Sequence, residues 1–191
     1  MSSRIRVYMG CSVDGFIAGP DDDLSFLENS QKDENGNLPK VDEDGPAVQY
    51  HDFIKDIGVI LMGRNTYEVV NGMDIPWPYG DMPILVLTSR PLESPPPTVK
   101  RVAGAIHEVI DTAKKTAGEK DVYLDGGNLI RQALDAGLVD ELTITMVPIL
   151  LGKGISLFPG LQKECLLEFQ EVHRFNQKSI QIIAKPKKAS S

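Results

Sequence analysis

Hydrophobic and polar residues alternate with two different periods along the chain, and these periods predict strands and helices in turn. Ile5, Val7 and Met9 alternate with polar positions, which is typical of a strand with one face in the core. Continuous apolar runs predict strands covered on both faces at residues 59–62, 84–87 and 122–124. Helical spacing predicts helices at residues 46–58, where Pro46 suits the first helical position, 63–70, 106–118 and 128–136.

The last third of the chain returns to the two-residue period. Leu142, Ile144 and Met146 alternate with threonines, and residues 166–172 and 180–184 are two further strand candidates. Strands separated by helices usually pair in parallel, whereas closely spaced strands pair antiparallel. A length of 191 residues suits one domain with a substantial core. We therefore predict a single α/β domain over residues 1–191, with a mixed, mostly parallel sheet and antiparallel C-terminal strands.

Composition and charge argue against several classes of function. The formal net charge of -7 and the pI of about 5.0 disfavour a surface for nucleic acid or anionic membranes. No apolar stretch is long enough for a transmembrane helix, and the N-terminal residues lack a signal-peptide core. Cys11 and Cys165 match no metal-ligand spacing, so we expect free thiols and a cytoplasmic location. Asp21, Asp22 and Asp23 are better explained as a solvated loop than as a metal site, and we expect no metal.

Three turns carry the candidate chemistry, because each directly follows a predicted strand. In open α/β sheets, ligands bind at the carboxyl ends of the strands. The first turn, residues 63–66, combines a glycine, a helix start and Arg64, and the second, residues 88–90, adds two hydroxyls and Arg90. The third pairs Gly126 with Gly127, so that backbone amides can face a pyrophosphate. The three turns together predict a site for a dinucleotide with an extra phosphate. This prediction requires Arg64, Arg90 and Gly126 to lie on one side of the molecule.

Each turn also has a simpler explanation when it is taken alone. Arg64 could be a solvated side chain at a helix start, and a pair of glycines is more often structural than ligand-binding. Signatures of other nucleotide sites and of hydrolases are missing, since the chain has no G-x-G-x-x-G after its first strand, no phosphate-binding P-loop and no nucleophile elbow. The three histidines, His51, His107 and His173, occur in separate elements without metal or triad spacing.

The order of these motifs resembles the dihydrofolate-reductase-like reductases. Within that family, the chain is most similar to the C-terminal reductase domain of the riboflavin-pathway deaminase-reductase, and it lacks the zinc signature of the deaminase half. The segments that carry the resemblance extend over nearly the whole chain: residues 9–18, 62–68, 87–90, 123–130, 139–142, Pro148 and 152–154.

The resemblance implies a three-layer αβα sandwich with NADPH lying across the carboxyl edge of its sheet. Arg64, Thr66, Ser89 and Arg90 would hold the adenosine end with its 2'-phosphate, residues 126–130 the pyrophosphate, and residues near Met9 the nicotinamide. The cofactor-binding residues so implied are Met9, Gly10, Ile17, Ala18, Gly63, Arg64, Asn65, Thr66, Thr88, Ser89, Arg90, Leu124, Gly126, Gly127, Asn128, Leu129 and Ile130. Members of this branch often dimerise, and the strand 142–147 is a candidate to pair across a two-fold axis.

Two residues are candidates for catalysis. Gln49 falls near the place where dihydrofolate reductases carry a carboxylate that engages the pterin, which disfavours folate reduction. Asp14 is a candidate substrate contact or proton relay, and the alternative is an aspartate that only shapes its turn. Tyr50, Trp77 and Tyr79 are candidate stacking surfaces, or packing anchors in their loops.

The leading hypothesis is an NADPH-dependent oxidoreductase that transfers a hydride to a small polar heterocycle. The substrate would be ribosylaminopyrimidine-like or pterin-like, as in 5-amino-6-(5-phosphoribosylamino)uracil reductase. Hydride transfer requires a suitable distance and orientation of the reacting groups and the exclusion of water, and it requires no activated nucleophile. The alternatives are an NADPH-binding regulatory module without turnover, a true dihydrofolate reductase and a flavin-dependent reductase.

Overall fold

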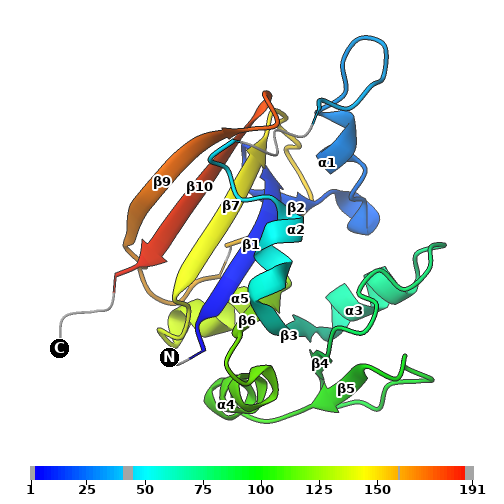
Figure 1. Ribbon diagram of the computed structural model, residues 1–191, viewed down its shortest axis with the longest axis vertical. Coiled ribbons are helices and arrows are strands. Elements are labelled where there is room, and N and C mark those ends of the chain that lie inside the picture. Colours follow the sequence, from blue (N-terminus) through cyan, green and yellow to red (C-terminus); the bar gives the residue numbers. More distant parts are fainter. Residues whose placement is uncertain (1–2, 41–44, 159, 188–191) are drawn as a thin grey trace.

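The computed structural model describes residues 3–40, 45–158 and 160–187, and its main element is an eight-stranded sheet (Figure 1). The strands lie in the order β5-β4-β3-β6-β1-β7-β10-β9, and β2 and β8 form a separate small sheet. The strands are β1 (Ile5–Ser12), β2 (Phe16–Ala18), β3 (Ile57–Gly63), β4 (Ile84–Leu87), β5 (Val99–Val102), β6 (Asp121–Asp125), β7 (Glu141–Val147), β8 (Ile155–Ser156), β9 (Leu167–Phe175) and β10 (Ser179–Pro186).

The pairing follows the prediction of a mostly parallel sheet with antiparallel C-terminal strands. The six strands from β5 to β7 in the sheet order are all parallel to their neighbours, because a helix or a long connection returns the chain to the same edge each time. β10 is antiparallel to β7, and β9 is antiparallel to β10. Figure 1 shows β9 and β10 at the end of the sheet opposite to β4 and β5.

Helices cover both faces of the sheet, which confirms the α/β layered fold. The α-helices are α1 (Phe26–Asn29), α2 (Tyr50–Phe53), α3 (Arg64–Asn71), α4 (Ile106–Ala117) and α5 (Gly127–Asp135), with short 3-10 helices at Pro20–Asp22 and Ile54–Asp56. α4 and α5 bury residues such as Val109 and Ile130 against one face. Phe53 and Tyr67 bury α2 and α3 against the other face, near Tyr123.

Some expected elements differ from the structure. The helix expected at residues 46–58 begins only at Tyr50, because Gln49 has extended backbone with φ -78° and ψ 150°. Pro46 therefore lies outside it, so its predicted place as the first helical residue is wrong. The strands β2, β5 and β8 were not predicted, since β2 and β8 have only three and two residues and β5 has two basic residues, Lys100 and Arg101, at its centre. Pairing of the strand 142–147 across a two-fold axis is also wrong, because β7 is bonded to β1 on one edge and to β10 on the other.

Candidate functional site

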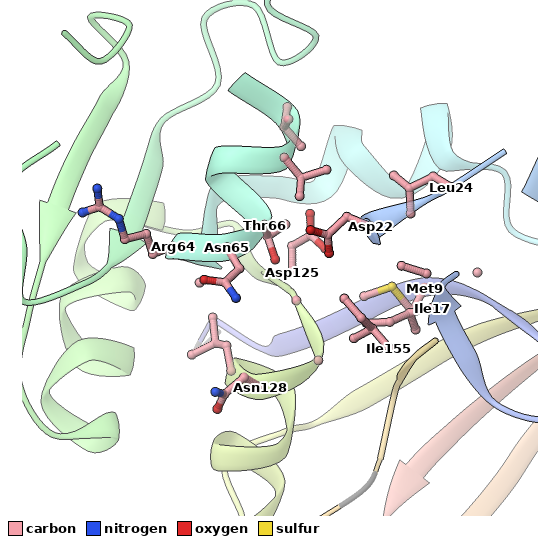
Figure 2. Close-up of a pocket in the computed structure, with 18 of the residues that line it drawn as sticks. Met9, Ile17, Asp22, Leu24, Arg64, Asn65, Thr66, Asp125, Asn128 and Ile155 are labelled. Atoms are coloured by element: carbon pink, nitrogen blue, oxygen red, sulfur yellow. The ribbon is translucent and has the colours of Figure 1, made fainter. Parts of the chain in front are cut away.

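A cavity of about 770 Å³ opens at the carboxyl ends of β3, β4 and β6, beside the middle of β1. Figure 2 shows Arg64 at one end of this cavity and Met9, Ile17 and Leu24 at the other, with Asp125 between them. The lining residues are Met9, Gly10, Ile17, Ala18, Asp22, Leu24, Leu27, Tyr50, Gly63, Arg64, Asn65, Thr66, Val69, Val70, Met73, Ile75, Pro78, Tyr79, Leu87, Asp125, Gly126, Gly127, Asn128, Leu129, Arg131, Gln132 and Ile155.

Arg64 is the first residue of α3, directly after β3 ends at Gly63. Its Nε donates to Glu68 at 2.6 Å, one helical turn away, and its Nη1 donates to the Pro91 carbonyl at 3.0 Å and the Arg90 carbonyl at 3.4 Å. These bonds fix the guanidinium where the ends of β3 and β4 meet. The expected closeness of Arg64 and Arg90 is therefore present in the structure.

The turn after β4 supplies a second basic group and also reveals a third. Thr88 is buried, and its hydroxyl accepts a hydrogen bond from the Arg90 amide at 3.2 Å, while Ser89 and Arg90 are exposed. Arg101 on β5 donates from Nη1 to the Ser89 carbonyl at 3.0 Å. Three guanidinium-bearing residues, Arg64, Arg90 and Arg101, therefore gather around one turn of an acidic protein. We call them the arginine cluster.

The glycine turn between β6 and α5 closes against the start of α3. Gly126 has φ 101°, a conformation that favours glycine, and a Cβ there would collide with the Thr66 hydroxyl. A Cβ on Gly127 would lie 3.2 Å from Nη1 of Arg131, which itself donates to the carbonyls of Ser156 and Leu157. Close packing therefore requires glycine at both positions, and the turn still lines the cavity at the start of α5, where backbone amides favour a phosphate. Gly126 thus lies on the same side of the molecule as Arg64.

The opposite end of the cavity is apolar. Met9 and Gly10 from β1 line it together with Ile17 and Ala18 from β2. A Cβ on Gly10 would lie only 3.0 Å from the Leu27 side chain, so Leu27 covers the strand closely at this point. This end offers a water-poor surface to a planar ring.

Asp125, the last residue of β6, is the acidic group within the cavity wall between the two ends. Burial raises the pKa of its carboxyl group to about 6, and hydrogen bonding to the Gly126 amide and the Tyr79 hydroxyl only partly offsets the effect. Burial also raises the pKa of Tyr50 to about 12, with a smaller contribution from the Asp125 charge. A carboxyl group with a pKa near 6 can hold and release a proton at neutral pH.

Asp14 and Gln49, the two candidates for catalysis, do not line the cavity among the described residues. The Asp14 carboxylate accepts hydrogen bonds from the Ser12 hydroxyl at 2.6 Å and from the amides of Gly152 at 2.7 Å and Leu151 at 3.1 Å. These bonds lower its pKa. Gln49 is buried at the start of α2, with its amide nitrogen 3.3 Å from the Asn176 side-chain oxygen. Both side chains form hydrogen bonds with loops, and their catalytic role stays a prediction.

Most of the predicted cofactor residues do line the cavity. Those that do are Met9, Gly10, Ile17, Ala18, Gly63, Arg64, Asn65, Thr66, Gly126, Gly127, Asn128 and Leu129. Leu124 and Ile130 are instead fully buried in the core, where they support the glycine turn from below. Thr88, Ser89 and Arg90 do not line the cavity, but Arg64, which does, donates to the Thr88 hydroxyl and to the Arg90 carbonyl.

Sequence reasoning missed Asp22, Arg101, Asp125 and Arg131 as site residues. Asp125 had a usable signal, because it is a carboxylate at the end of a buried strand and next to paired glycines. The sequence signal for Arg101 was weaker, because this residue lies in a short run, residues 98–102, that follows the prolines. Tyr50 and Tyr79 do line the cavity, as expected for stacking surfaces, whereas Trp77 packs edge-on against Tyr79 with ring centroids 5.4 Å apart.

The described part of the chain contains no group of three or more His, Cys, Asp or Glu side chains placed to hold a metal ion. Within the same residues, no helix is both long enough and apolar enough to cross a membrane.

Comparison with known proteins extends these observations. The family model for the RibD C-terminal domain matches residues 4–181. Two proteins of Bacillus subtilis (strain 168), both uncharacterised, are similar along nearly their whole length. YwjB is 26% identical over 178 residues, which cover 93% of this chain and 95% of YwjB. YyaP is 27% identical and aligns with 94% of this chain and 93% of its own length.

Solved structures give the same picture at the level of the fold. A Shewanella sp. PV-4 protein assigned to riboflavin biosynthesis has a TM-score of 0.81 and 29% identity, covering 97% of this chain and 99% of that one. The Thermotoga maritima diaminohydroxyphosphoribosylaminopyrimidine deaminase/5-amino-6-(5-phosphoribosylamino)uracil reductase has a TM-score of 0.68 at 13% identity, with 97% of this chain and 57% of that chain covered. Dihydrofolate reductase from Enterococcus faecalis, solved with NADP(H), has a TM-score of 0.57 at 17% identity and is covered to 99%, against 98% of this chain. The last two show the shared fold only.

Proposed function

The chain belongs to the RibD C-terminal domain family, and from this premise we propose that it is an NADPH-dependent reductase of a small heterocyclic substrate. The family and its reductase neighbours support a reductase-like role. The observation that carries the choice of NADPH is the arginine cluster beside the glycine turn that lines the cavity. It is a concentration of positive charge at the sheet edge of a protein with a net charge of -7.

The types of residue at this edge of the sheet suit NADPH. Arg64, Arg90 and Arg101 would hold a 2'-phosphate, since a guanidinium matches phosphate oxygens in geometry and charge. Gly126, Gly127 and Asn128 line the cavity at the start of α5, where a pyrophosphate would meet the backbone amides. Met9 and Ile17 would then border the nicotinamide ring. When bound, NADPH supplies a hydride to the electrophilic carbon of a C=N or C=O bond.

The heteroatom of that bond must also receive a proton, and Asp125 is the group placed to deliver it. Its side chain lines the cavity between the arginine cluster and the apolar end. Its pKa, raised to about 6 by burial, keeps a part of the carboxyl groups protonated near neutral pH. Tyr79, which interacts with the same carboxylate, would hold it in position. The apolar wall formed with Leu27 would exclude water from the reacting atoms.

The test compares NADPH and NADH binding in three variants. We expect Arg64→Ala and Arg101→Ala each to weaken NADPH binding by about 10- to 100-fold, the value of one or two charge-assisted hydrogen bonds, with little change for NADH. Arg174→Ala is the matched control, because Arg174 is an exposed arginine on β9 that bonds only its own turn among the described residues. Dissociation constants come from the fluorescence of the bound nicotinamide. Equal losses for NADPH and NADH would contradict the proposal. NADPH binding without oxidation by any heterocycle would favour a binding module that lacks turnover.

A homodimer is part of the proposal. The face of the sheet formed by β9 and β10 exposes Phe169 to 62%, Val172 to 57% and Ile180 to 46%, and no helix of the two packed layers covers it. Exposed apolar side chains that gather on one face suit an interface, and a second copy related by a two-fold axis would present the same surface to it. The contact would therefore use this sheet face instead of the edge of β7.

We also place the protein in the cytoplasm. Cys11 and Cys165, its two cysteines, are both free thiols, which suits a reducing compartment. The acidic overall charge suits a small-molecule enzyme better than a protein that binds nucleic acid or anionic membranes.

A further inference from the structure

The charges that line the cavity are divided between its two ends. We call the part lined by Asp22, Leu24, Leu27, Tyr50, Tyr79 and Asp125 the substrate end. Its walls are aliphatic and aromatic, and its two charged groups, Asp22 and Asp125, are both acidic. The rings of Tyr50 and Tyr79 lie close enough to the Asp125 carboxylate for its charge to raise the pKa of both hydroxyls, although burial contributes more.

No cation reaches the substrate end among the described lining residues. The basic side chains that line the cavity are Arg64 and Arg131. Arg64 is directed away from Asp125 in Figure 2 and donates to Glu68 and to the turn after β4. Arg131 lies beside Gly127, on the side of β2 and β8, and its Nη1 donates to the carbonyls of Ser156 and Leu157. Both guanidinium groups are therefore bonded to protein groups outside the substrate end.

From this division of charge we propose that the substrate is an unphosphorylated, neutral or cationic planar heterocycle that carries amino groups. The inference rests on the proposed function and narrows its substrate class. Carboxylates accept hydrogen bonds and would pair with ring amino groups, and the aromatic and aliphatic walls suit a flat ring. A phosphoribosyl group would instead bring about two negative charges next to Asp22 and Asp125, with no basic side chain from the described cavity wall to compensate them. The chain therefore differs in specificity from the reductase that acts on 5-amino-6-(5-phosphoribosylamino)uracil.

The experiment measures the binding of matched heterocycles to the protein saturated with NADP⁺, by calorimetry. The probes are 5-amino-6-(5-phosphoribosylamino)uracil, the same compound without its phosphate, and an unphosphorylated dihydropterin. We expect the better of the two unphosphorylated compounds to bind at least about tenfold more tightly than the phosphorylated one. Equal or tighter binding of the phosphorylated compound overturns the inference, and so does failure of both unphosphorylated compounds to bind.

Asp22 and Asp21 provide a matched pair of variants. They are adjacent and exposed, and both have left-handed backbone, with φ 60° and 58°, which asparagine tolerates, but only Asp22 lines the cavity. Asp22→Asn should improve binding of the phosphorylated compound by about three- to tenfold relative to the unphosphorylated one, and less so at high salt, whereas Asp21→Asn should leave the ratio unchanged. An equal effect of both variants overturns the inference. NADPH binding is measured first and separately, so a protein that does not bind NADPH identifies a failure of the proposed function itself.

Discussion

The Asp125 carboxyl group links the burial of one side chain to the chemistry of the site. It is held at the cavity wall by the end of β6, and burial raises its pKa to about 6. The same burial destabilises the folded protein when this carboxyl group is charged, and it supplies a protonated acid near neutral pH. Protonation removes the cost of a buried charge, while the acid that delivers a proton must be the protonated form.

We expect the pH dependence of the reaction to follow this group. If Asp125 donates the proton, the rate of reduction should fall as the pH rises through about 6. Asp125→Asn should lower kcat by roughly 100-fold and abolish this dependence, while NADPH binding is retained. A pH profile of NADPH oxidation from pH 5 to 8 measures both effects. A wild-type profile that is flat over this range would argue for another proton donor.

Asp125→Asn should raise the stability of the protein, although it lowers kcat. Because the folded-state pKa lies above the unfolded value of about 3.9, the folded protein binds more protons between pH 4 and 6. Stability from this group is complete below pH 4 and is lost as the pH rises through 6. Asp125→Asn should therefore raise the free energy of unfolding at pH 7 by about 1–3 kcal/mol and have less effect at pH 4, as measured by urea denaturation. A variant that is less stable at pH 7 would contradict this account.

Gly126 is the second residue whose conformation decides the site. Gly126→Ala would force a Cβ into the Thr66 hydroxyl at φ 101°, so we expect a loss of about 2–3 kcal/mol in unfolding free energy and weaker NADPH binding. Gly137→Ala is the control, because Gly137 also has positive φ, at 67°, but a Cβ there meets nothing within 4 Å. The control should cost about 1 kcal/mol and leave NADPH binding intact. Similar effects of the two variants on NADPH binding would exclude a special role for the glycine turn.

At the scale of elements, the site depends on loops that join strands far apart in the sequence. The Asp14 carboxylate connects the turn between β1 and β2 to the amides of Leu151 and Gly152, which precede β8. The turn and the loop flank the small β2–β8 sheet, whose Ile17 and Ile155 line the cavity. A side chain outside the cavity can therefore hold part of its wall in place.

Asp14→Asn tests whether this residue acts through structure. The variant replaces one of the two carboxylate oxygens, each of which accepts from a different amide, by an NH2 group that cannot accept, so we expect a lower thermal midpoint and a higher KM, with kcat changed by less than about threefold. Hydrogen bonds lower the pKa of Asp14, so its contribution to stability is present at neutral pH and is lost as the pH falls below its usual value near 4. Thermal melts at pH 7 and pH 3 should thus differ more for the wild type than for the variant. A large fall in kcat without a change in melting would restore Asp14 as a catalytic candidate.

At the scale of the whole molecule, helices cover both faces of the sheet's parallel part and leave an apolar face on β9 and β10. Figure 1 shows that these two strands lie away from β4 and β5, so a second copy could cover them without reaching the arginine cluster. Association and cofactor binding should therefore be separable.

Val172→Glu tests the dimer. A charge at the centre of the proposed contact should convert a dimer into a monomer in sedimentation velocity, because the carboxylate would be buried without a partner. Gln170→Glu, on the same strand, introduces the same charge at a position that is already polar and exposed. The control should stay dimeric, and both variants should bind NADPH like the wild type. A wild-type protein that sediments as a monomer would refute the proposed dimer.

Local pattern alone determined much of this fold. The buried strands β3, β4 and β6 appear as continuous apolar runs, and the turns that follow them could be assigned to one edge because parallel strands end together. The arginines at residues 64 and 90 and the paired glycines could thus be expected to meet. These features depend on residues close in the sequence and on a general rule of sheet geometry.

The tertiary structure decided the features that depend on contacts between distant segments. β5 has only four residues, and its pairing with β4 is what brings Arg101 to Ser89. Asp125 has a raised pKa because the surrounding segments remove it from water, and Asp14 accepts two amide hydrogen bonds because the loop at 151–152 folds onto it. Burial and long-range hydrogen bonds are properties of the packed molecule, so a single run of residues does not encode them.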